Sequence, residues 1–202
     1  MQLRVAASLV EKDLLTPDHY PLSMNALLAA CNQTSNRHPV VDYDEHTVAN
    51  ALENLKGAGL ARVVYSKGMR VDKYRHVLHE ALHLELPDMA SLCVLMLRGP
   101  QTAAEVRART ERMHPFTDQG EVEGVLAGLA GREEPLVRLL PRQPGQKEQR
   151  WAHLLGGEPT PEDLAAEAAA NPARPRADRV GDLENRVASL EARLEALEQA
   201  RE

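Results

Sequence analysis

The chain contains one pattern typical of metal-dependent hydrolysis, the run His79-Glu80-Ala81-Leu82-His83. On a helix, the H-E-x-x-H spacing places two imidazoles one turn apart, where they can bind zinc while the glutamate acts as a general base. Here the run follows a predicted strand, Pro87 ends any helix soon after it, and no third ligand stands at a recognised spacing. We therefore expect a short connecting helix with partly exposed histidines and no metal site.

Other signatures of catalysis are absent from the sequence. It has no G-x-x-x-x-G-K-[ST], no G-x-G-x-x-G and no G-x-S-x-G, which are common nucleotide-binding and acyl-transfer motifs. Cys31 and Cys93 lie in apolar, helix-like surroundings without a C-x-x-C partner, as buried thiols of a cytosolic protein do. We predict a non-enzymatic protein without a cofactor.

Basic residues gather in two segments that we predict to form β-hairpins. Such clusters can neutralise several backbone phosphates of a nucleic acid, although a basic hairpin is also commonly just a solvated face. The predicted nucleic-acid contacts are Arg62, Lys67, Arg70, Lys73 and Arg75 in the first hairpin and Arg138, Arg142, Lys147 and Arg150 in the second.

The helix predicted before each hairpin is unsuited to the major groove. Residues 44–56 carry one lysine among three acids, and Asp118, Glu121 and Glu123 precede any arginine in the second helix. These carboxylates would face phosphates, so we expect the hairpins rather than the helices to contact nucleic acid.

A polar loop between two predicted helices is a second candidate surface. Its amides and guanidinium could dock a phosphate or a peptide, or they could cap helix ends as part of a tight connection. The residues concerned are Asn32, Gln33, Asn36 and Arg37.

A unit of about 75 residues occurs twice in the first 155 residues. The run 73–78 (KYRHVL) returns as 150–155 (RWAHLL), and Ser23 before one helical stretch corresponds to Thr102 before another. Tyr74 and Trp151 take equivalent places, where a ring would anchor each hairpin to its core.

Each unit is predicted to contain three helices followed by a two-stranded hairpin, the pattern of a winged helix. Ser23 and Asp44 are expected to cap the second and third helices of the first unit. The predicted helices are 3–14, 23–31 and 44–55 in the first unit and 88–98, 102–112 and 118–132 in the second. The predicted strands are 60–65 and 69–77 in the first unit and 136–140 and 150–155 in the second.

The remaining residues differ in composition. Residues 156–178 contain four prolines and are predicted to be a flexible linker. Apolar residues then recur at 3.5-residue spacing, which favours either self-association of a helix or packing on its own domain. The residues predicted to form a homodimer contact are Val180, Leu183, Val187, Leu190, Leu194 and Leu197.

The charge of the chain is unevenly distributed. The 202 residues are 43% hydrophobic, 27% charged and 3% aromatic, with a net charge of −6. Residues 156–202 carry six basic and eleven acidic residues, and the first 155 residues are nearly neutral. The chain is therefore no polycation, and without an apolar span or export signal we expect it to be cytoplasmic and away from membranes.

Four runs of the sequence are characteristic. They are Tyr20-Pro21-Leu22-Ser23-Met24-Asn25-Ala26-Leu27, Cys31-Asn32-Gln33, Arg109-Thr110-Glu111-Arg112 and Leu140-Pro141-Arg142-Gln143-Pro144-Gly145-Gln146-Lys147-Glu148. These runs closely resemble the YceH-like family of uncharacterised bacterial proteins. The resemblance covers about residues 1–155. It implies a tandem winged-helix fold, in agreement with the repeat, and it implies little about activity.

The sequence thus predicts a mostly α protein with small β-hairpins, of the α+β class. Its expected parts are winged-helix domains at 1–82 and 85–155, the linker at 156–178 and a coiled-coil-like helix at 179–202. The expected function is nucleic-acid binding or regulation through the basic hairpins. The alternative is a protein–protein adaptor that uses the same scaffold and the acidic helices to hold a basic partner.

Overall fold

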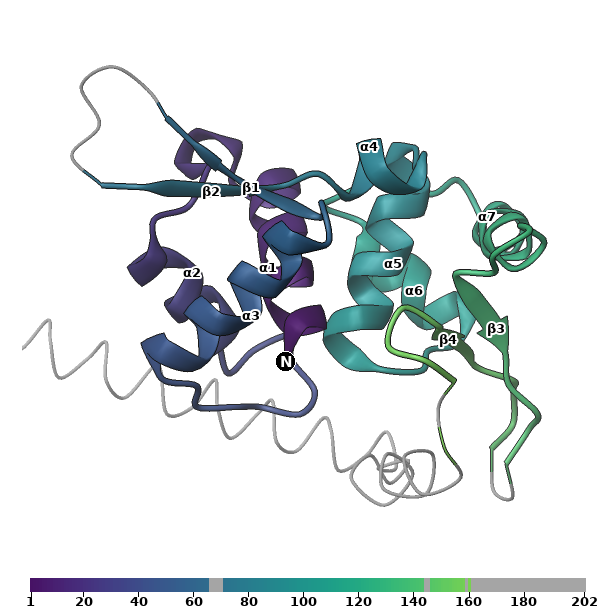
Figure 1. Cartoon of the computed structure of the whole chain (residues 1–202). Helices are drawn as coiled ribbons and strands as arrows, with labels where there is room; N and C mark the ends of the chain where they lie inside the picture. The colour runs from purple at the N-terminus through teal and green to yellow at the C-terminus, as the bar shows by residue number, and fades with distance from the viewer. Residues whose placement is uncertain (66–70, 144–145, 159, 161–202) are drawn as a thin grey trace, which may run out of the picture. The chain divides into compact units, whose positions relative to one another are not determined.

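A computed structural model of the chain describes most of the first 160 residues (Figure 1). The described residues are 1–65, 71–143, 146–158 and 160. Within them, α-helices and two small antiparallel sheets follow one another, which confirms the α+β class. Apart from residues 156–158 and 160, the predicted linker falls outside the described residues, and so does the predicted C-terminal helix.

The first half of the described chain contains three longer helices and one hairpin. Its elements are α1 (Gln2–Leu15), the short 3-10 helix η1 (Pro17–His19), α2 (Met24–Cys31), α3 (Glu45–Gly57), β1 (Ala61–Val64) and β2 (Lys73–His76). The second half repeats this order after a short connecting helix. Its elements are α4 (Leu78–Leu82), α5 (Leu86–Arg98), α6 (Ala103–Thr110), α7 (Gln119–Ala130), β3 (Val137–Leu139) and β4 (Trp151–His153).

Side-chain caps explain where the helices begin. The Ser23 hydroxyl accepts from the amide of Ala26, and the Asp44 carboxylate accepts from that of Thr47, so both predicted caps are confirmed. Thr102, the counterpart of Ser23, forms a capping box with Glu105 at the start of α6. The repeated sequence therefore starts equivalent helices at equivalent places.

Each hairpin is joined to its own half by one further backbone bridge. Leu22 and Tyr74 exchange backbone hydrogen bonds of 3.1 and 2.8 Å, and Gln101 and Trp151 exchange bonds of 2.9 and 2.7 Å. Trp151 is buried in the hydrophobic core, and the partly buried Tyr74 packs against that core, as predicted for the two anchoring rings. These bridges fix each hairpin against the segment that precedes the second helix of its half.

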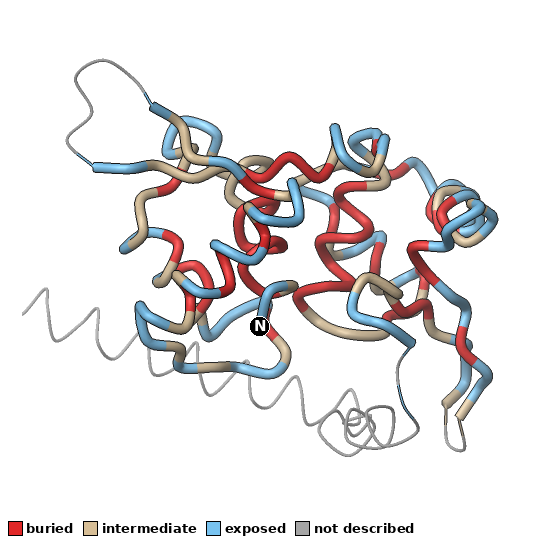
Figure 2. Tube along the Cα trace, viewed as in Figure 1, coloured by how far each residue is buried: buried red, intermediate tan, exposed pale blue. Residues whose placement is uncertain are grey.

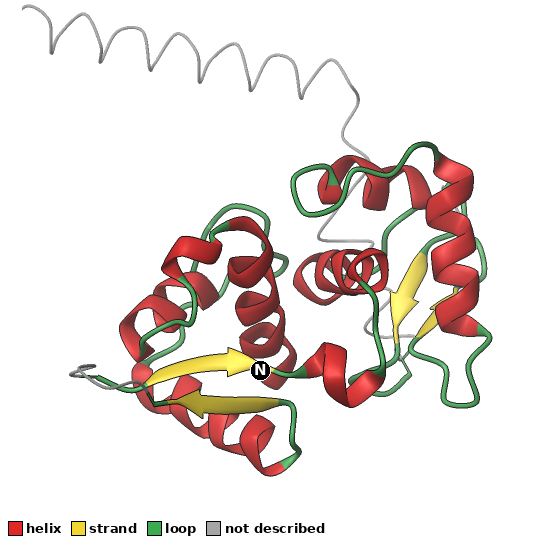
Figure 3. Cartoon of the chain, turned by 90° about the horizontal axis from the view of Figure 1, so that it is seen from above, coloured by secondary structure: helices red, strands yellow, loops and turns green. Residues whose placement is uncertain are grey.

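One hydrophobic core serves both halves. Helices α1 and α5 lie side by side between the two hairpins (Figure 1), and Figure 2 shows buried backbone running along both. Leu9 and Leu95 are fully buried members of this core. Residues 1–159 accordingly form one compact unit, with a hairpin in each half (Figure 3). No helix in the described part of the chain is long and apolar enough to cross a membrane.

Candidate nucleic-acid interface

The first hairpin places three predicted contact residues on one face. Arg62 pairs with Arg75 across the strands, and Val64 pairs with Lys73. Since side chains alternate along a strand, Arg62, Lys73 and Arg75 share the outer face. We call this surface the β1–β2 basic face. Two other predicted contacts, Lys67 and Arg70, lie outside the described residues.

The inner face of this hairpin is anchored to the helices. His76 is buried, and its Nε2 lies 3.0 Å from Asp13 Oδ2 at the end of α1. The backbone amide of His76 donates to the Tyr20 hydroxyl over 2.7 Å. These contacts hold the hairpin in one orientation, so the β1–β2 basic face is a fixed surface.

Glu80 on α4 opposes part of this positive charge. One of its carboxylate oxygens contacts Arg62, and the other lies 3.2 Å from Nη2 of Arg75. Lys73 makes no ion pair with any residue that the structure describes. The β1–β2 basic face therefore keeps a net positive charge within the described residues.

The H-E-x-x-H run forms the short connecting helix that we expected. Helix α4 ends at Leu82, and His83 has a left-handed backbone with φ of 49°, so the two histidines do not occupy successive turns of one helix. Glu80 contacts Arg62 and Arg75, and of the two imidazoles only that of His79 lies near it, at 3.6 Å. Among the described residues, no group of three or more His, Cys, Asp or Glu side chains could hold a metal ion.

Two exposed apolar side chains stand at the outer end of the first hairpin. Tyr65 is 81% exposed and Val71 is 60% exposed, just beyond the last strand pair. Exposed rings beside cations are typical of surfaces that contact bases or sugars. The sequence interpretation did not include Tyr65, although an aromatic residue next to a basic turn was a signal for it.

Of the four predicted contacts in the second hairpin, two form ion pairs and two do not form any with the described residues. Arg150 lies 2.7 Å from Glu105 and also donates to the carbonyl of Pro100, so it ties β4 to the start of α6. Arg138 lies 2.7 Å from Glu158. Arg142 and Lys147 are exposed and make no ion pair within the described chain.

Arg142 and Lys147 border a groove of about 660 Å³ between α7 and the second hairpin. Trp151, Leu139 and Ala127 supply apolar surface, whereas Glu123 and Glu148 add negative charge. With both signs of charge beside an apolar floor, this groove is less suited to a uniform phosphate backbone than the β1–β2 basic face.

The third helix of each half presents few cations, as the sequence predicts. On α3, Lys56 is paired with Glu53 at 2.8 Å, and the exposed Asn50 and His46 contact each other at 3.0 Å. On α7, Glu121 and Glu123 are exposed. These helices keep acidic outer surfaces.

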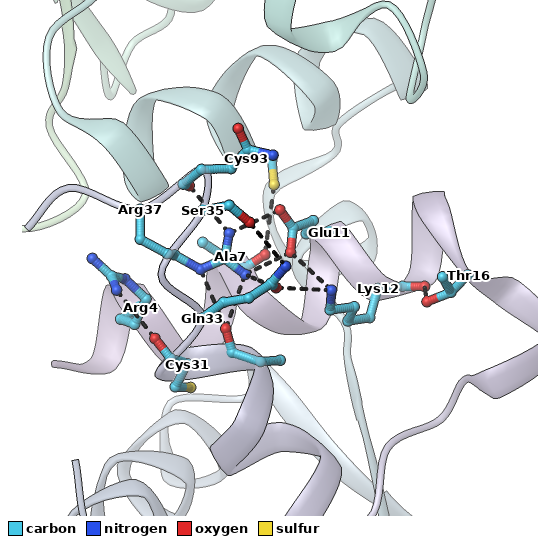
Figure 4. A network of polar contacts seen from close by, with 12 residues as sticks. Arg4, Ala7, Glu11, Lys12, Thr16, Cys31, Gln33, Ser35, Arg37 and Cys93 are labelled. Atoms are coloured by element: carbon cyan, nitrogen blue, oxygen red, sulfur yellow. Dashed lines mark hydrogen bonds and ion pairs between the residues drawn. The ribbon is translucent and has the colours of Figure 1, made fainter. Parts of the chain in front are cut away.

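The polar loop is used inside the molecule (Figure 4). Arg37 is buried, and its Nη1 and Nη2 lie 2.8 and 2.6 Å from the two carboxylate oxygens of Glu11. Its Nε and Nη2 also donate to the carbonyl of Ala30. Burial alone would raise the pKa of Glu11, but hydrogen bonds and charge from Arg37 hold that pKa below its ordinary value.

The amides of the same loop have partners as well. Asn32 exchanges hydrogen bonds with the backbone of Tyr43 at 2.8 and 2.9 Å. Gln33 accepts from Lys12, and Asn36 accepts from Arg98. These contacts favour the connecting role over ligand docking for this loop.

The two cysteines are buried and unpaired. Burial raises the pKa of both thiols above the ordinary value, so neither favours the reactive thiolate. This agrees with the prediction of buried thiols.

Comparison with known proteins identifies the family. Residues 1–146 match the family described as "Protein of unknown function, DUF480". The UPF0502 protein of Citrifermentans bemidjiense is 51% identical over 186 residues, which cover 92% of this chain and 86% of that protein. The UPF0502 protein of Geobacter sulfurreducens is 48% identical over 197 residues, which cover 98% of this chain and 88% of that protein.

The chain therefore belongs to the DUF480, or UPF0502, family of uncharacterised bacterial proteins, which confirms the resemblance seen in the sequence. An alignment of 197 residues also extends past residue 156, so the similarity reaches further along the chain than 1–155.

Proposed function

We propose that this protein is a non-enzymatic, cytoplasmic tandem winged-helix protein that binds nucleic acid through its hairpins. The repeated order of three helices and a hairpin supports the winged-helix assignment. So do the isolated backbone bridges from Leu22 to Tyr74 and from Gln101 to Trp151, because each joins a hairpin to the residue pair before the second helix of its half, where a winged helix has its first strand.

The observation that carries the nucleic-acid function is the β1–β2 basic face. Arg62, Lys73 and Arg75 project from a hairpin that is anchored through His76, and among the described residues only Glu80 pairs with them. Just beyond β1, Tyr65 adds an exposed ring at the outer end of the same hairpin. The cations can contact phosphates, and an exposed ring on the same hairpin can contact bases.

A fluorescence anisotropy titration of the full chain against labelled duplex DNA tests this function. We expect binding at about 50 mM salt that weakens steeply toward about 200 mM, because phosphate contacts release counterions. Lys73→Gln is expected to weaken binding, whereas Arg112→Gln, which removes an exposed cation outside the hairpins, is the matched control. Equal effects of the two substitutions would count against a hairpin interface.

A second candidate function is a protein–protein adaptor. The groove between α7 and the second hairpin favours it, because apolar surface from Trp151 and Leu139 lines it together with charged residues of both signs, Arg142 and Glu123. A folded chain that binds no DNA at low salt, yet forms a stoichiometric complex with one protein after nuclease treatment, would support the adaptor. Loss of that complex in Leu139→Asp would locate it in the groove.

A further inference from the structure

Two arginines lie directly opposite each other on the β1–β2 basic face. Arg62 and Arg75 are cross-strand partners, so their side chains leave the same face at neighbouring points. Like charges in this arrangement repel, and a hairpin that served only as a solvated surface would gain stability from a neutral or oppositely charged pair at these positions. The pair instead forms a site that attracts an anion.

An internal carboxylate fills this site. Glu80 directs one oxygen to Arg62 and the other to Arg75, and His79 Nε2 lies 3.6 Å from the oxygen that faces Arg75. A carboxylate that offers one oxygen to each guanidinium has the same contacts that two phosphate oxygens would make. Glu80 thus stands where a phosphate of a bound ligand would lie.

The contact of Glu80 with Arg62 and Arg75 can be replaced by a contact with another anion. The side chains of Arg62, Arg75 and Glu80 are 49%, 36% and 48% exposed, and half-exposed ion pairs contribute little to stability. Helix α4, which carries Glu80, has five residues, and its C-terminal carbonyls at Leu82 and His83 are held by Arg132. The helix therefore keeps its place when the Glu80 side chain turns away.

We propose that Arg62 and Arg75 form a phosphate site and that Glu80 occupies it as an internal competitor until a nucleic-acid phosphate displaces the carboxylate. This inference rests on the proposed nucleic-acid function. It adds a named site and an internal competitor for that site. No covalent step is involved, because one anion replaces another on the same guanidinium groups.

Glu80→Gln in the full chain is the central test. It removes the competing charge while keeping the side-chain volume, so we expect the affinity for duplex DNA at about 100 mM salt to rise about threefold to tenfold. Glu53→Gln is the matched control, because it removes an equal charge from the Glu53–Lys56 pair on α3. Glu80→Ala provides a second variant, and thermal unfolding verifies that each is folded.

A double-mutant comparison isolates the site itself. In the Arg62→Gln/Arg75→Gln background, Glu80→Gln is expected to leave the DNA affinity unchanged. If DNA binds but Glu80→Gln and Glu53→Gln behave alike, the phosphate site is overturned and the nucleic-acid function stands.

A titration with inorganic phosphate tests the phosphate site independently of the nucleic-acid function. Side-chain nitrogen NMR of arginine follows phosphate binding without any nucleic acid, and the signals of Arg62 and Arg75 should shift at lower phosphate concentration in Glu80→Gln than in the natural chain. That result without DNA binding by any variant would uphold the site and refute the nucleic-acid function. Unchanged arginine signals in Glu80→Gln would refute the site.

Discussion

Arginine serves two different purposes in this chain. Arg37 is buried, forms an ion pair with Glu11 and donates a hydrogen bond to the Ala30 carbonyl, whereas Arg62 and Arg75 are half exposed on a hairpin. A buried guanidinium without its partner would be strongly destabilising, while an exposed one can change partners at little cost. Burial therefore decides which arginines maintain the fold and which are available to a ligand.

Substitution of Arg37 tests its structural role. Arg37→Met removes both guanidinium contacts of the buried Glu11 carboxylate and leaves it only Lys12, whose Nζ lies 3.4 Å away. We expect a loss of about 3–5 kcal/mol in the free energy of unfolding measured with urea. The control is Arg138→Gln, which breaks the exposed pair with Glu158 and should cost less than about 1 kcal/mol. Similar losses in the two variants would contradict the distinction.

The Glu11–Arg37 pair also predicts a pH dependence. The pKa of Glu11 is lower in the folded chain than its ordinary value of 4.5, so its contribution to stability is present above that pH and is lost as the pH falls below it. Urea unfolding between neutral pH and about pH 3 should show a smaller decline for Glu11→Gln than for the natural chain. Parallel declines would refute this assignment.

Helices and strands are the most predictable level of the structure. Caps such as Ser23 and Asp44 act within three residues, so the sequence pattern locates helix starts. The ion pairs are not predictable in this way, because Glu80 is 18 residues from Arg62 and Glu105 is 45 residues from Arg150. Their meeting depends on strand register and helix packing, which explains why the sequence pattern alone suggests a general base at Glu80.

The exposed glycines of α7 provide a test at the level of the element. A Cβ at Gly124 or Gly128 would meet no atom within 4 Å, and alanine is a better helix former. Gly124→Ala and Gly128→Ala should each raise the free energy of unfolding by roughly 0.5–1 kcal/mol.

Gly59 is the matched control for these substitutions. Its site is equally open, but its φ of +72° disfavours any residue with a Cβ, so Gly59→Ala should destabilise the chain. Destabilisation by Gly124→Ala or Gly128→Ala would show that α7 has a constraint that its open surroundings do not reveal.

At the scale of the whole molecule, the two halves share a core through α1 and α5, so the two hairpins belong to one compact unit. Binding by one hairpin then raises the effective concentration of the other near the same ligand, provided that the ligand reaches both. A dimer would double the number of hairpins.

Deletion of residues 179–202 tests the predicted dimer, whose apolar residues lie outside the described part of the chain. Light scattering should give a dimer for the full chain and a monomer for the truncated one, because the heptad spacing needs a partner helix. An unchanged mass after deletion would assign these residues another role.

The salt dependence of DNA binding tests the central claim most directly. Lys73, Arg142 and Lys147 have no ion-pair partner among the described residues, and their joint replacement by glutamine should lower the slope of log affinity against log salt by about 0.9 for each phosphate that the chain no longer neutralises. We predict measurable binding at about 50 mM salt and a shallower slope for the triple variant. A folded, full-length chain that binds no DNA at that salt concentration would contradict the account.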